Sequence, residues 1–481
     1  MLTPRVKRCL ALALAAAIFC ALGGANARGQ TAGTARFPLR VEPGKRYLID
    51  AESKPFFIIG DSPWTLAANI NNLDLALYLD DRARRGFNAL LFSAMERCYT
   101  LDWSGADGTC GSVRNFRGDP PFEKNDGGLY QFAKPVEAYW RNVDRVVAEA
   151  SKRNFLLLIA PAFVGVGAGS DGWWHDMIAA GTAGMEQWGR FIATRYKAND
   201  NILWINGGDY STPDWDYIDA VARGIESVKP NSLFTYHGGR GSAAIDLAAD
   251  RRWLRVNAIY TDELVAKFAR SSYAKSTMPF FLLEAMYEDD WASGYGVRKQ
   301  AWQASLGGAT GQLLGIKTVW RFASGWKKDL DSGGTRSISA LGRIFSSLSW
   351  WLLIPDIDFS FEVAIDGRRP DTAALATISP AALASDGSFG LVYNSDCMPG
   401  RKNRAGPCLA SEFKGPSRSL SVAISKLRGS HVEATWIDPF TGGRSRAGRL
   451  RTRTSGVTDF RTPGRNAAGD TDWLLLLRSV R

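Results

Sequence analysis

The sequence is poor in histidine and lacks several motifs that mark common enzyme classes. Of 481 residues only three are histidines, His175, His237 and His431, and none stands in the HExxH spacing of a zinc hydrolase. No GxSxG motif lies between an expected strand and an expected helix, where an α/β serine hydrolase carries its nucleophile. These absences disfavour both hydrolase classes, and we expect neither a metal nor another cofactor.

No block of basic residues stands out, although the chain carries a surplus of positive charge. Lys and Arg number 59 against 48 for Asp and Glu, which gives a net charge of +11. Because the surplus is spread along the chain and no recognition motif accompanies it, we do not expect nucleic-acid binding. A mild attraction to acidic polymers is compatible with this charge. The apolar share of 45% is typical of a soluble globular protein with a large core.

Long apolar runs are absent after the first 27 residues. Residues 1–27 predict a signal peptide, because Arg5, Lys7 and Arg8 precede a short apolar run and Ala25–Ala27 forms a small-x-small cleavage site. The alternative is a membrane anchor, but the run is shorter than the roughly 20 residues that span a bilayer. We therefore expect export to the periplasm or the medium, without stable membrane insertion.

Cysteines are few, and those outside the leader form two local pairs. Cys98 and Cys110 flank one short loop, and Cys397 and Cys408 flank another. An exported protein can oxidise both pairs, so we expect two local disulfides. Zinc binding is the competing interpretation, but neither pair has CxxC spacing or a nearby histidine. Free thiols are the third possibility.

From residue 56 onward, short apolar runs alternate with longer amphipathic stretches. This alternation indicates repeated strand-helix units around a parallel sheet, and eight repeats fit a (β/α)8 TIM barrel. A doubly wound open sheet is the alternative, but the GxGxxG turn expected after its first strand is missing. The expected strands are Phe56–Asp61, Asn88–Met95, Phe155–Pro161, Asn201–Asp209, Leu233–Gly238, Val256–Thr261, Pro279–Tyr287 and Gly315–Phe322.

The pattern changes after residue 354. Segments rich in Gly, Pro, Ser and Arg surround alternating runs such as Phe389–Tyr393, Val432–Ile437 and Trp473–Leu477. These runs predict strands joined by turns, and hence a small all-β sandwich domain packed behind the barrel. The expected organisation is a signal peptide over 1–27, a barrel over 28–354 and a β-sandwich domain over 355–481.

Two carboxylates end apolar runs that should be wholly buried. Asp209 ends the fourth expected strand and Glu284 lies at the end of the apolar run of the seventh. A barrel carries its active site at the carboxyl ends of its strands, and a buried carboxylate is costly unless it is paired or faces a cleft. Two carboxylates facing one cleft are what glycoside hydrolysis requires. We therefore interpret Asp209 and Glu284 as a catalytic pair, whose separation the sequence does not give.

Aromatic and polar residues near the same strand ends predict a sugar-binding cleft. A sugar ring packs its C–H face on an aromatic side chain, while carboxylates and histidine hold its hydroxyls. Taken singly, each aromatic residue is better explained by core packing, and it is their clustering at one rim that favours a ligand surface. Helix capping is the alternative role for Asp61. The expected substrate-binding residues are Asp61, Trp64, Trp173, His237, Tyr260, Tyr287 and Trp320.

Three stretches resemble a known family. Residues 56–64 (FFIIGDSPW), 78–88 (YLDDRARRGFN) and 201–209 (NILWINGGD) are similar to the apiosidase-like glycoside hydrolases, and residues 436–442 (WIDPFTG) are similar to the β module that follows the barrel in this family. The resemblance implies that Asp209 is the acid/base and Glu284 the nucleophile of a retaining enzyme. Asn206 departs from the family, which usually has a bulky apolar residue there. The loop bearing Cys98 and Cys110 is also particular to this sequence, so apiose specificity is not carried over.

The leading hypothesis is an exported retaining glycoside hydrolase that acts on a plant or bacterial polysaccharide or oligosaccharide. The alternative is a non-catalytic envelope protein that binds glycan or matrix through a barrel scaffold. The presence of both carboxylates disfavours that alternative. The sugar, its linkage and the oligomeric state are not determined by the sequence.

Overall fold

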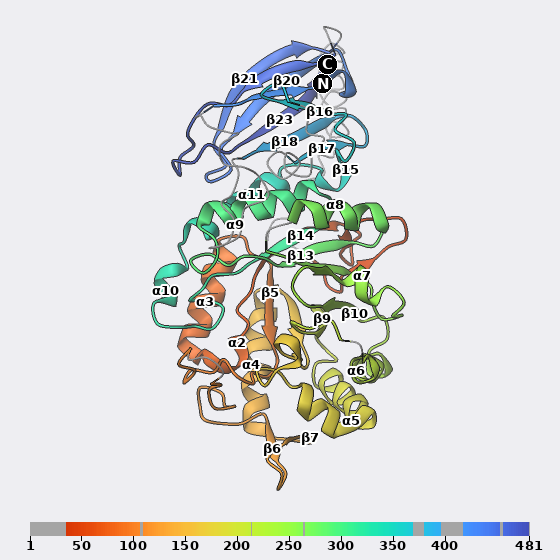
Figure 1. The fold of residues 1–481 in the computed structure, drawn as a ribbon, viewed down its shortest axis with the longest axis vertical. Helices are drawn as coiled ribbons and strands as arrows, with labels where there is room; N and C mark the ends of the chain where they lie inside the picture. The colour runs from red at the N-terminus through yellow and green to blue at the C-terminus, as the bar shows by residue number, and fades with distance from the viewer. Residues whose placement is uncertain are drawn as a thin grey trace, which may run out of the picture.

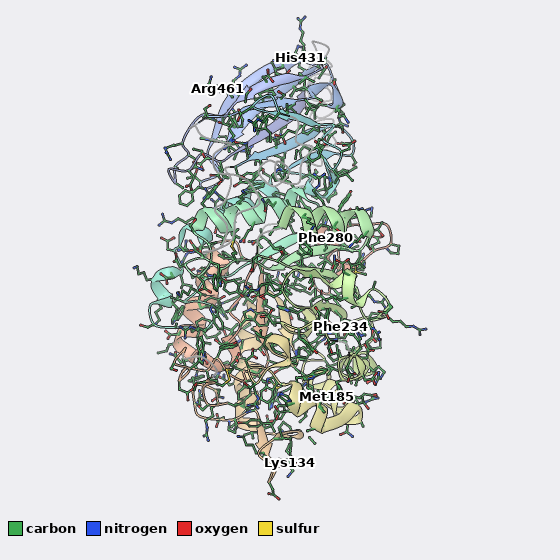
Figure 2. All side chains as sticks on the ribbon, viewed as in Figure 1. Lys134, Met185, Phe234, Phe280, His431 and Arg461 are labelled. Atoms are coloured by element: carbon green, nitrogen blue, oxygen red, sulfur yellow. A yellow bond between two sulfur atoms is a disulfide. The ribbon has the colours of Figure 1, made fainter. Side chains whose placement is uncertain are left out.

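A computed structural model describes residues 35–481, apart from 106–108, 213, 263–264, 369–379, 396–416, 453–455 and 481. The expected signal peptide and the pair Cys397 and Cys408 therefore lie outside the described residues. Two parts follow one another along the long axis, with Lys134 near one end and His431 near the other (Figure 2). Among the helices that the structure describes, none is long and apolar enough to cross a bilayer.

The first part is built on a curled sheet of nine strands, of which eight run parallel. Its strand order is β10-β9-β8-β5-β4-β14-β13-β12-β11. Apolar runs such as LLLIA in β8 are buried along their whole length, as is typical of parallel strands covered on both faces. The strands are β4 (Ile58–Asp61), β5 (Ala89–Ser93), β8 (Leu156–Ala160), β9 (Ile202–Gly207), β10 (Leu233–His237), β11 (Ser242–Ala243), β12 (Asn257–Tyr260), β13 (Phe280–Glu284) and β14 (Gly311–Leu314).

The seam of the curled sheet lies between β10 and β12. No ladder joins these two strands in the described residues, but the N–H groups of Arg255 and Val256 both donate to the Phe234 carbonyl oxygen at 3.1 Å. The structure thus has the α/β architecture that the alternating pattern indicated, and full closure of a (β/α)8 barrel at this seam stays a prediction.

Amphipathic helices surround the sheet (Figure 1). In α4 the residues Val143, Val146, Val147 and Ala150 are buried at helical spacing, which places one stripe against the strands. The helices are α2 (Leu66–Asn69), α3 (Asn72–Arg84), α4 (Glu137–Lys152), α5 (Trp174–Arg195), α6 (Asp216–Val228), α7 (Ala244–Ala248), α8 (Val265–Lys275), α9 (Gly294–Leu306), α10 (Trp326–Asp329) and α11 (Gly333–Ser346). Short 3-10 turns occur at Val166–Ala168, Trp350–Leu352 and Ile424–Lys426.

The last parallel strand of the curled sheet differs from the one expected over 315–322. The observed strand β14 is Gly311–Leu314, and it pairs with β4 from Gly311 opposite Ile58 to Leu314 opposite Asp61. The chain leaves the sheet at Gly315, where a Cβ atom would lie 2.3 Å from the Tyr287 ring. The residues that follow form turns, and these turns carry Trp320 to the carboxyl end of the sheet.

The second part consists of two antiparallel sheets that share a core. The six-stranded sheet has the order β15-β17-β18-β23-β20-β21, and the three-stranded sheet has the order β16-β19-β22. Phe361, Leu420 and Phe460 from the smaller sheet pack with Val392, Trp436 and Leu475 from the larger one. The strands are β15 (Leu353–Pro355), β16 (Glu362–Ile365), β17 (Ala381–Ala384), β18 (Phe389–Asn394), β19 (Ser419–Val422), β20 (His431–Ile437), β21 (Arg444–Arg451), β22 (Thr458–Arg461) and β23 (Trp473–Val480).

Two small sheets complete the described strands. Three short strands that precede the curled sheet pair with one another, namely β1 (Arg40–Val41), β2 (Leu48–Ile49) and β3 (Pro55–Phe56). A hairpin formed by β6 (Phe122–Lys124) and β7 (Tyr130–Pro135) precedes α4. The hairpin lies at the far end from the second part (Figure 1).

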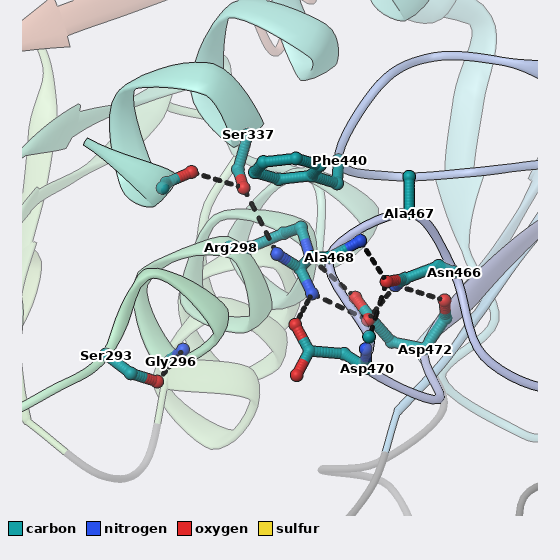
Figure 3. Close-up of polar contacts among 12 residues, drawn as sticks. Ser293, Gly296, Arg298, Ser337, Phe440, Asn466, Ala467, Ala468, Asp470 and Asp472 are labelled. Carbon is teal, nitrogen blue, oxygen red and sulfur yellow. Dashed lines mark hydrogen bonds and ion pairs between the residues drawn. The ribbon is translucent and has the colours of Figure 1, made fainter. Parts of the chain in front are cut away.

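The two parts meet through apolar packing and one buried ion cluster. Helices α9 and α11 lie between the curled sheet and the C-terminal sheets (Figure 1), and Leu474 and Leu476 of β23 belong to the same core as Phe345 of α11. Arg298 of α9 donates from Nε and Nη2 to the two carboxylate oxygens of Asp472 at 2.7 Å each (Figure 3). Its Nη2 also donates to Asp470 at 2.7 Å. We call Arg298, Asp470 and Asp472 the junction cluster.

Candidate active site

Three ends of parallel strands bring the central residues together. His237 is the last residue of β10 and pairs with Gly207, the last residue of β9, while Glu284 is the last residue of β13. Asp209 follows β9 by two residues. One carboxylate oxygen from each of Asp209 and Glu284 and one ring nitrogen of His237 lie within 4.8 Å of one another. The pair predicted from strand-end carboxylates therefore shares one site.

Two glycines place Asp209 at this position. Gly207 has a φ of +92°, and a Cβ atom there would lie 2.5 Å from the His237 carbonyl oxygen. A Cβ atom on Gly208 would lie 2.7 Å from the Val164 backbone nitrogen. Only glycine adopts this backbone at such close approach without strain, so the Gly207-Gly208 pair lets the chain turn tightly and direct Asp209 toward Glu284.

His237 is buried and has an oxygen at each ring nitrogen. Its Nε2 lies 2.8 Å from Glu284 Oε2, and its Nδ1 lies 3.0 Å from the Gly238 carbonyl oxygen. Burial by itself lowers the pKa of His237, but the hydrogen bond and charge of Glu284, with Asp209 and Gly238, raise it above its usual value. Only an imidazolium donates from both nitrogens, so the geometry and the pKa favour a protonated His237 that donates to Glu284 and to the Gly238 carbonyl oxygen.

Asp209 is in the opposite situation. Burial and the charge of Glu284 raise the pKa of Asp209 to about 6, although His237, Arg240 and a hydrogen bond from Tyr260 act to lower it. Its Oδ1 is buried and has no hydrogen-bond partner among the described residues. A carboxyl group with a pKa near neutrality and a free oxygen can give a proton to a bound molecule and take one back. The two carboxyl groups therefore differ in character because their surroundings differ.

Tyr287 and Trp64 support Glu284 from the other side. The Tyr287 hydroxyl hydrogen-bonds Glu284, and it accepts a hydrogen bond from Trp64 Nε1 at 2.8 Å. Because the indole donates to the phenolic oxygen, the phenolic proton remains for Glu284. Burial, together with the charge of Glu284, raises the pKa of Tyr287 well above its usual value and keeps that proton in place. Glu284 is thus held by two donors in a defined orientation.

A bulge and an ion pair set the wall beside Asp209. The register of β12 against β13 shifts between Ile259 and Tyr260, and such a bulge re-aims the side chain that follows it. Arg240 Nε donates to the Tyr260 hydroxyl oxygen at 3.0 Å, and Arg240 Nη1 donates to Asp262 at 3.0 Å. The Tyr260 hydroxyl is therefore fixed where it donates to Asp209.

These residues line a cavity of about 170 Å³ at the carboxyl ends of the strands. Five aromatic side chains besides Tyr260 and Tyr287 contribute to it, which gives a ligand apolar surface beside the carboxylates. The lining residues are Trp64, Ser93, Glu96, Tyr99, Phe163, Val166, Asp209, Arg240, Tyr260, Asp262, Glu284, Ala285, Tyr287, Asp290, Trp291 and Trp320. Trp291 is about half exposed, at 52%, which places it at the rim.

The structure brings most of the expected substrate-binding residues to this cavity. Trp64, Tyr260, Tyr287 and Trp320 line it, and His237 lies against it through Glu284. Trp320 packs against Tyr99 with ring centroids 5.2 Å apart, and Tyr99 packs against Trp103 at 5.1 Å. The aromatic side of the cavity is therefore a continuous surface built from separate loops.

Asp61 and Trp173 do not line the cavity. Asp61 Oδ2 accepts from the Tyr78 hydroxyl at 2.7 Å and lies 3.6 Å from Arg82, both on α3. Because successive strand side chains point to opposite faces, this one points outward into the helix layer, where it ties β4 to α3. Trp173 is fully buried against Phe122 and Tyr130, and its Nε1 donates to the Met95 carbonyl oxygen at 3.2 Å. Both residues hold the scaffold together.

Glu96 is a cavity residue that the sequence analysis missed. Its Oε1 accepts from the backbone N–H groups of Arg97, Cys98 and Tyr99 at 2.9–3.0 Å, and burial raises its pKa. Glu96 directly follows the second expected strand, so the rule that identified Asp209 and Glu284 applied to it as well. Glu96 therefore adds a buried carboxyl group to the cavity lining and anchors the loop that begins there.

That loop is closed by a disulfide. Cys98 and Cys110 are bonded with an S–S distance of 2.08 Å, which confirms one of the two expected pairs. Tyr99 lies inside the closed loop, and its hydroxyl donates to Asp171 at 3.2 Å. The loop contributes Tyr99 to the cavity lining, so the disulfide restrains part of the ligand space.

Asp209, His237 and Glu284 could also hold a metal ion on geometric grounds. The observed contacts favour an acid-base cluster instead. His237 Nε2 would have to leave Glu284 to face an ion, and both ring nitrogens already face oxygen acceptors. A protonated imidazole is not a metal ligand, because the ligand form is the neutral ring.

Sequence comparison identifies related domains. Residues 42–352 match a family model described as "Apiosidase-like, catalytic domain", and residues 411–478 match one described as "Putative collagen-binding domain of a collagenase". A search of curated protein sequences found no match. The first match covers more than half of the chain and contains every residue of the cavity.

Solved structures share the fold. A protein described as a glycoside hydrolase has a TM-score of 0.72 and 19% identity, covering 94% of this chain and 98% of its own. A glycoside hydrolase family 5 protein from Bacteroides vulgatus has a TM-score of 0.72 and 20% identity, covering 92% of each chain. At this identity the likeness establishes the fold alone, and it extends over both parts of the molecule.

Proposed function

The chain belongs to the apiosidase-like family, and from this premise we propose that it is a retaining glycoside hydrolase acting on a polysaccharide or an oligosaccharide. The observation that carries the proposal is the placement of Asp209 and Glu284. One oxygen of each lies within 4.8 Å of the other, at the base of a cavity with aromatic walls. Retaining enzymes hold their carboxyl groups about 5–5.5 Å apart, whereas inverting enzymes hold them about 6.5–9.5 Å apart.

In the first step the Glu284 carboxylate attacks the anomeric carbon and the glycosidic C–O bond breaks. Asp209 gives its proton to the departing oxygen, for which a pKa of about 6 suits it. Glu284 is then esterified to the sugar. Loss of its negative charge removes the main charge that raised the pKa of Asp209, so Asp209 ionises readily and becomes a base.

In the second step Asp209 takes a proton from water as that water attacks the anomeric carbon. The sugar–Glu284 bond breaks, and the sugar leaves with its original anomeric configuration. His237 and Tyr287 donate hydrogen bonds to Glu284 and hold it in the attacking orientation. They also stabilise it when it is released as a carboxylate.

We also propose that the mature protein is exported. The disulfide between Cys98 and Cys110 supports this, because such bonds persist in oxidising compartments. The leader expected over residues 1–27 agrees with it. N-terminal sequencing of the protein recovered from its native host tests the proposal, since a mature chain that begins at Met1 would contradict it.

A reducing-sugar screen tests the catalytic proposal. The mature protein is incubated with a panel of plant and bacterial polysaccharides beside Glu284→Gln and a control, Glu123→Gln, in which an exposed glutamate of β6 is changed. We expect release by the wild type and the control but not by Glu284→Gln. Equal release by all three proteins would place the chemistry elsewhere. Saturable binding without any release from the panel would instead support the binding-protein alternative.

A further inference from the structure

Strand β21 carries four exposed arginines in eight residues. They are Arg444, Arg446, Arg449 and Arg451, in the sequence RSRAGRLR. The strand forms one edge of the six-stranded sheet, at the outer margin of the C-terminal part (Figure 1). Positive charge that looks dispersed along the sequence is therefore concentrated on one element.

A β-bulge places all four arginines on the same face. Residues three apart on a regular strand point to opposite faces, so Arg446 and Arg449 should diverge. The register against β20 shifts between Ala434 and Thr435, so that Arg446 lies opposite Thr435 and Arg449 lies opposite Glu433. Thr435 and Glu433 both face away from the core that contains Ala434. The extra residue of the bulge thus brings Arg446 and Arg449 to the same face of the sheet, together with Arg444 and Arg451.

Two more arginines extend this surface. Arg478 of β23 lies opposite Glu433 on its other side, and its Nη2 donates to the Ser347 carbonyl oxygen at 3.4 Å. Arg444 donates to Ser347 Oγ at 3.0 Å, so Arg444 and Arg478 meet at the end of α11. Arg343 of α11 donates to the Thr441 carbonyl oxygen, just before β21. We call Arg343, Arg444, Arg446, Arg449, Arg451 and Arg478 the arginine face.

Three arginines of this face have no carboxylate partner in the described part of the chain. Glu433 is the carboxylate on the outer side of β20, and His431 is its other titratable neighbour there. Among the described residues, Arg444, Arg446 and Arg449 have no carboxylate oxygen within 4 Å. Partial burial and the charge of Arg444 lower the pKa of Arg478, which shows that the two cations repel each other. Such clustering is unfavourable in the free protein unless an anion relieves it.

Charged side chains on an edge strand also prevent pairing with another chain. Preventing edge pairing requires charged side chains on β21 alone, and these side chains can be either positive or negative. It does not account for a bulge that keeps four cations on one face, or for the continuation of that face onto β23 and α11. The arrangement has a further use.

We propose that the arginine face binds an anionic polysaccharide through carboxylates of its uronic acid residues. Arginine forms paired hydrogen bonds with carboxylates. Because alternate residues of a strand lie about 6.8 Å apart, β21 presents a row of regularly spaced guanidinium groups to a polymer. β21 contains no aromatic side chain for stacking bases, which disfavours single-stranded nucleic acid. The choice of a carbohydrate rests on the proposed function. Binding of the polysaccharide at the arginine face would raise the local concentration of the polymer at the cavity, because both sites belong to one molecule.

The test measures binding of the full chain to polygalacturonate and to its fully methyl-esterified form, by isothermal titration calorimetry. The Glu284→Gln background prevents any hydrolysis during the titration. The variant Arg446→Gln/Arg449→Gln removes two central cations, and Arg252→Gln/Arg255→Gln removes the same charge from the exposed loop before β12. We expect the first pair to weaken binding about tenfold and the second to leave it unchanged. The esterified polymer should bind weakly, and added salt should weaken binding of the acidic form.

Equal binding of the two polymers, or full affinity in Arg446→Gln/Arg449→Gln, would overturn the proposal. Tighter binding to a DNA oligonucleotide, to anionic vesicles or to collagen than to polygalacturonate would overturn the choice of partner. The proposed hydrolase activity can fail separately. A protein that binds polygalacturonate through these arginines but releases no reducing sugar from any glycan would retain this inference and lose the proposed function.

Discussion

Asp209 and Asp472 are both poorly accessible aspartates, but the structure treats their charges in opposite ways. Asp472 is fully buried and accepts hydrogen bonds from Arg298, from the Tyr393 hydroxyl at 2.7 Å and from Asn466 Nδ2 at 2.7 Å. Asp209 has one oxygen without a hydrogen-bond partner among the described residues, and the charge that acts on it most strongly is that of another carboxylate, Glu284. The first carboxylate joins two parts of the molecule, and the second faces a cavity.

The two aspartates illustrate two uses of a buried carboxylate, one that stabilises the fold and one that is suited to proton transfer. A fully paired carboxylate is stable as an anion and has little tendency to exchange its proton. A carboxylate desolvated beside a like charge has a raised pKa, which costs stability but permits proton transfer near neutral pH. Two nitrogens of Arg298 hold Asp472 at 2.7 Å each, whereas within the described part of the chain no Lys or Arg nitrogen pairs with Asp209.

The largest expected effect is a loss of activity that occurs when the cavity is changed but not when the junction cluster is changed. Glu284→Gln should lower kcat by at least about 10³-fold, because the amide has nearly the shape of the proposed nucleophile but cannot attack the sugar. Its melting temperature should remain near that of the wild type. Asp470→Asn, at the edge of the junction cluster, serves as the control and should retain activity. An active Glu284→Gln variant would contradict the assignment of the cavity as the catalytic region.

The second expected effect is a loss of stability when the junction cluster is broken. Arg298→Met should destabilise the fold by about 3–5 kcal/mol, because removing one partner leaves the carboxylate of Asp472 buried and uncompensated. Chemical denaturation measures this loss. Arg336→Met, which breaks an exposed pair with Asp331, should change stability little. Adding Asp472→Asn to Arg298→Met should restore part of the loss, and no restoration would show that packing alone had been disturbed.

The third effect is a pH dependence that belongs to the cavity alone. The proposed acid must carry its proton, and its pKa of about 6 means that kcat/KM should fall about tenfold per pH unit above pH 6. Arg298→Met should keep this profile at temperatures where it is folded. The Asp209→Asn variant should not show this decrease of kcat/KM above pH 6. A wild-type profile that is flat from pH 6 to 9 would assign the acid role to another group.

The smallest effect concerns the cost of the raised pKa. The folded protein holds the proton of Asp209 more tightly than the unfolded chain does, so the contribution of Asp209 to the free energy of unfolding falls as pH rises from about 4 to about 6. Asp209→Asn does not titrate, and above pH 6 it should be more stable than wild type by about 1–3 kcal/mol. Below pH 4 the two should be similar. A less stable Asp209→Asn variant at pH 8 would mean that the carboxylate is well compensated.

Strand-end reasoning located the centre of the site because parallel strands bring their carboxyl ends to one edge. It placed Asp209, His237 and Glu284 without any knowledge of loops. It failed for Asp61 because the sequence does not specify which way a strand-end side chain points. It overlooked Glu96, which satisfies the same rule one residue after an apolar strand. Trp173 was misassigned because a buried aromatic cluster and a ligand surface have the same composition.

Features that depend on register or loop geometry could not be predicted. The arginines of β21 looked like part of a dispersed surplus of charge, because a bulge between Ala434 and Thr435 decides whether they share a face. The last parallel strand was expected at 315–322 but lies at Gly311–Leu314. Short apolar runs stand on both sides of Gly315, and no periodicity in the sequence shows which of them forms the strand. The aromatic wall of Tyr99, Trp103 and Trp320 joins loops far apart in the sequence, and such contacts leave no local pattern.

Trapping a covalent intermediate tests the central claim most directly. The Asp209→Ala variant is mixed with an activated aryl glycoside of the sugar that the screen identifies, quenched and digested for peptide mass spectrometry. The good leaving group departs without acid assistance, whereas the second step lacks its base, so the intermediate accumulates. The account predicts that the peptide containing Glu284 gains the mass of one glycosyl residue, and that added Glu284→Gln abolishes the gain. Hydrolysis by the wild type with inverted configuration and no adduct on Glu284 would contradict it.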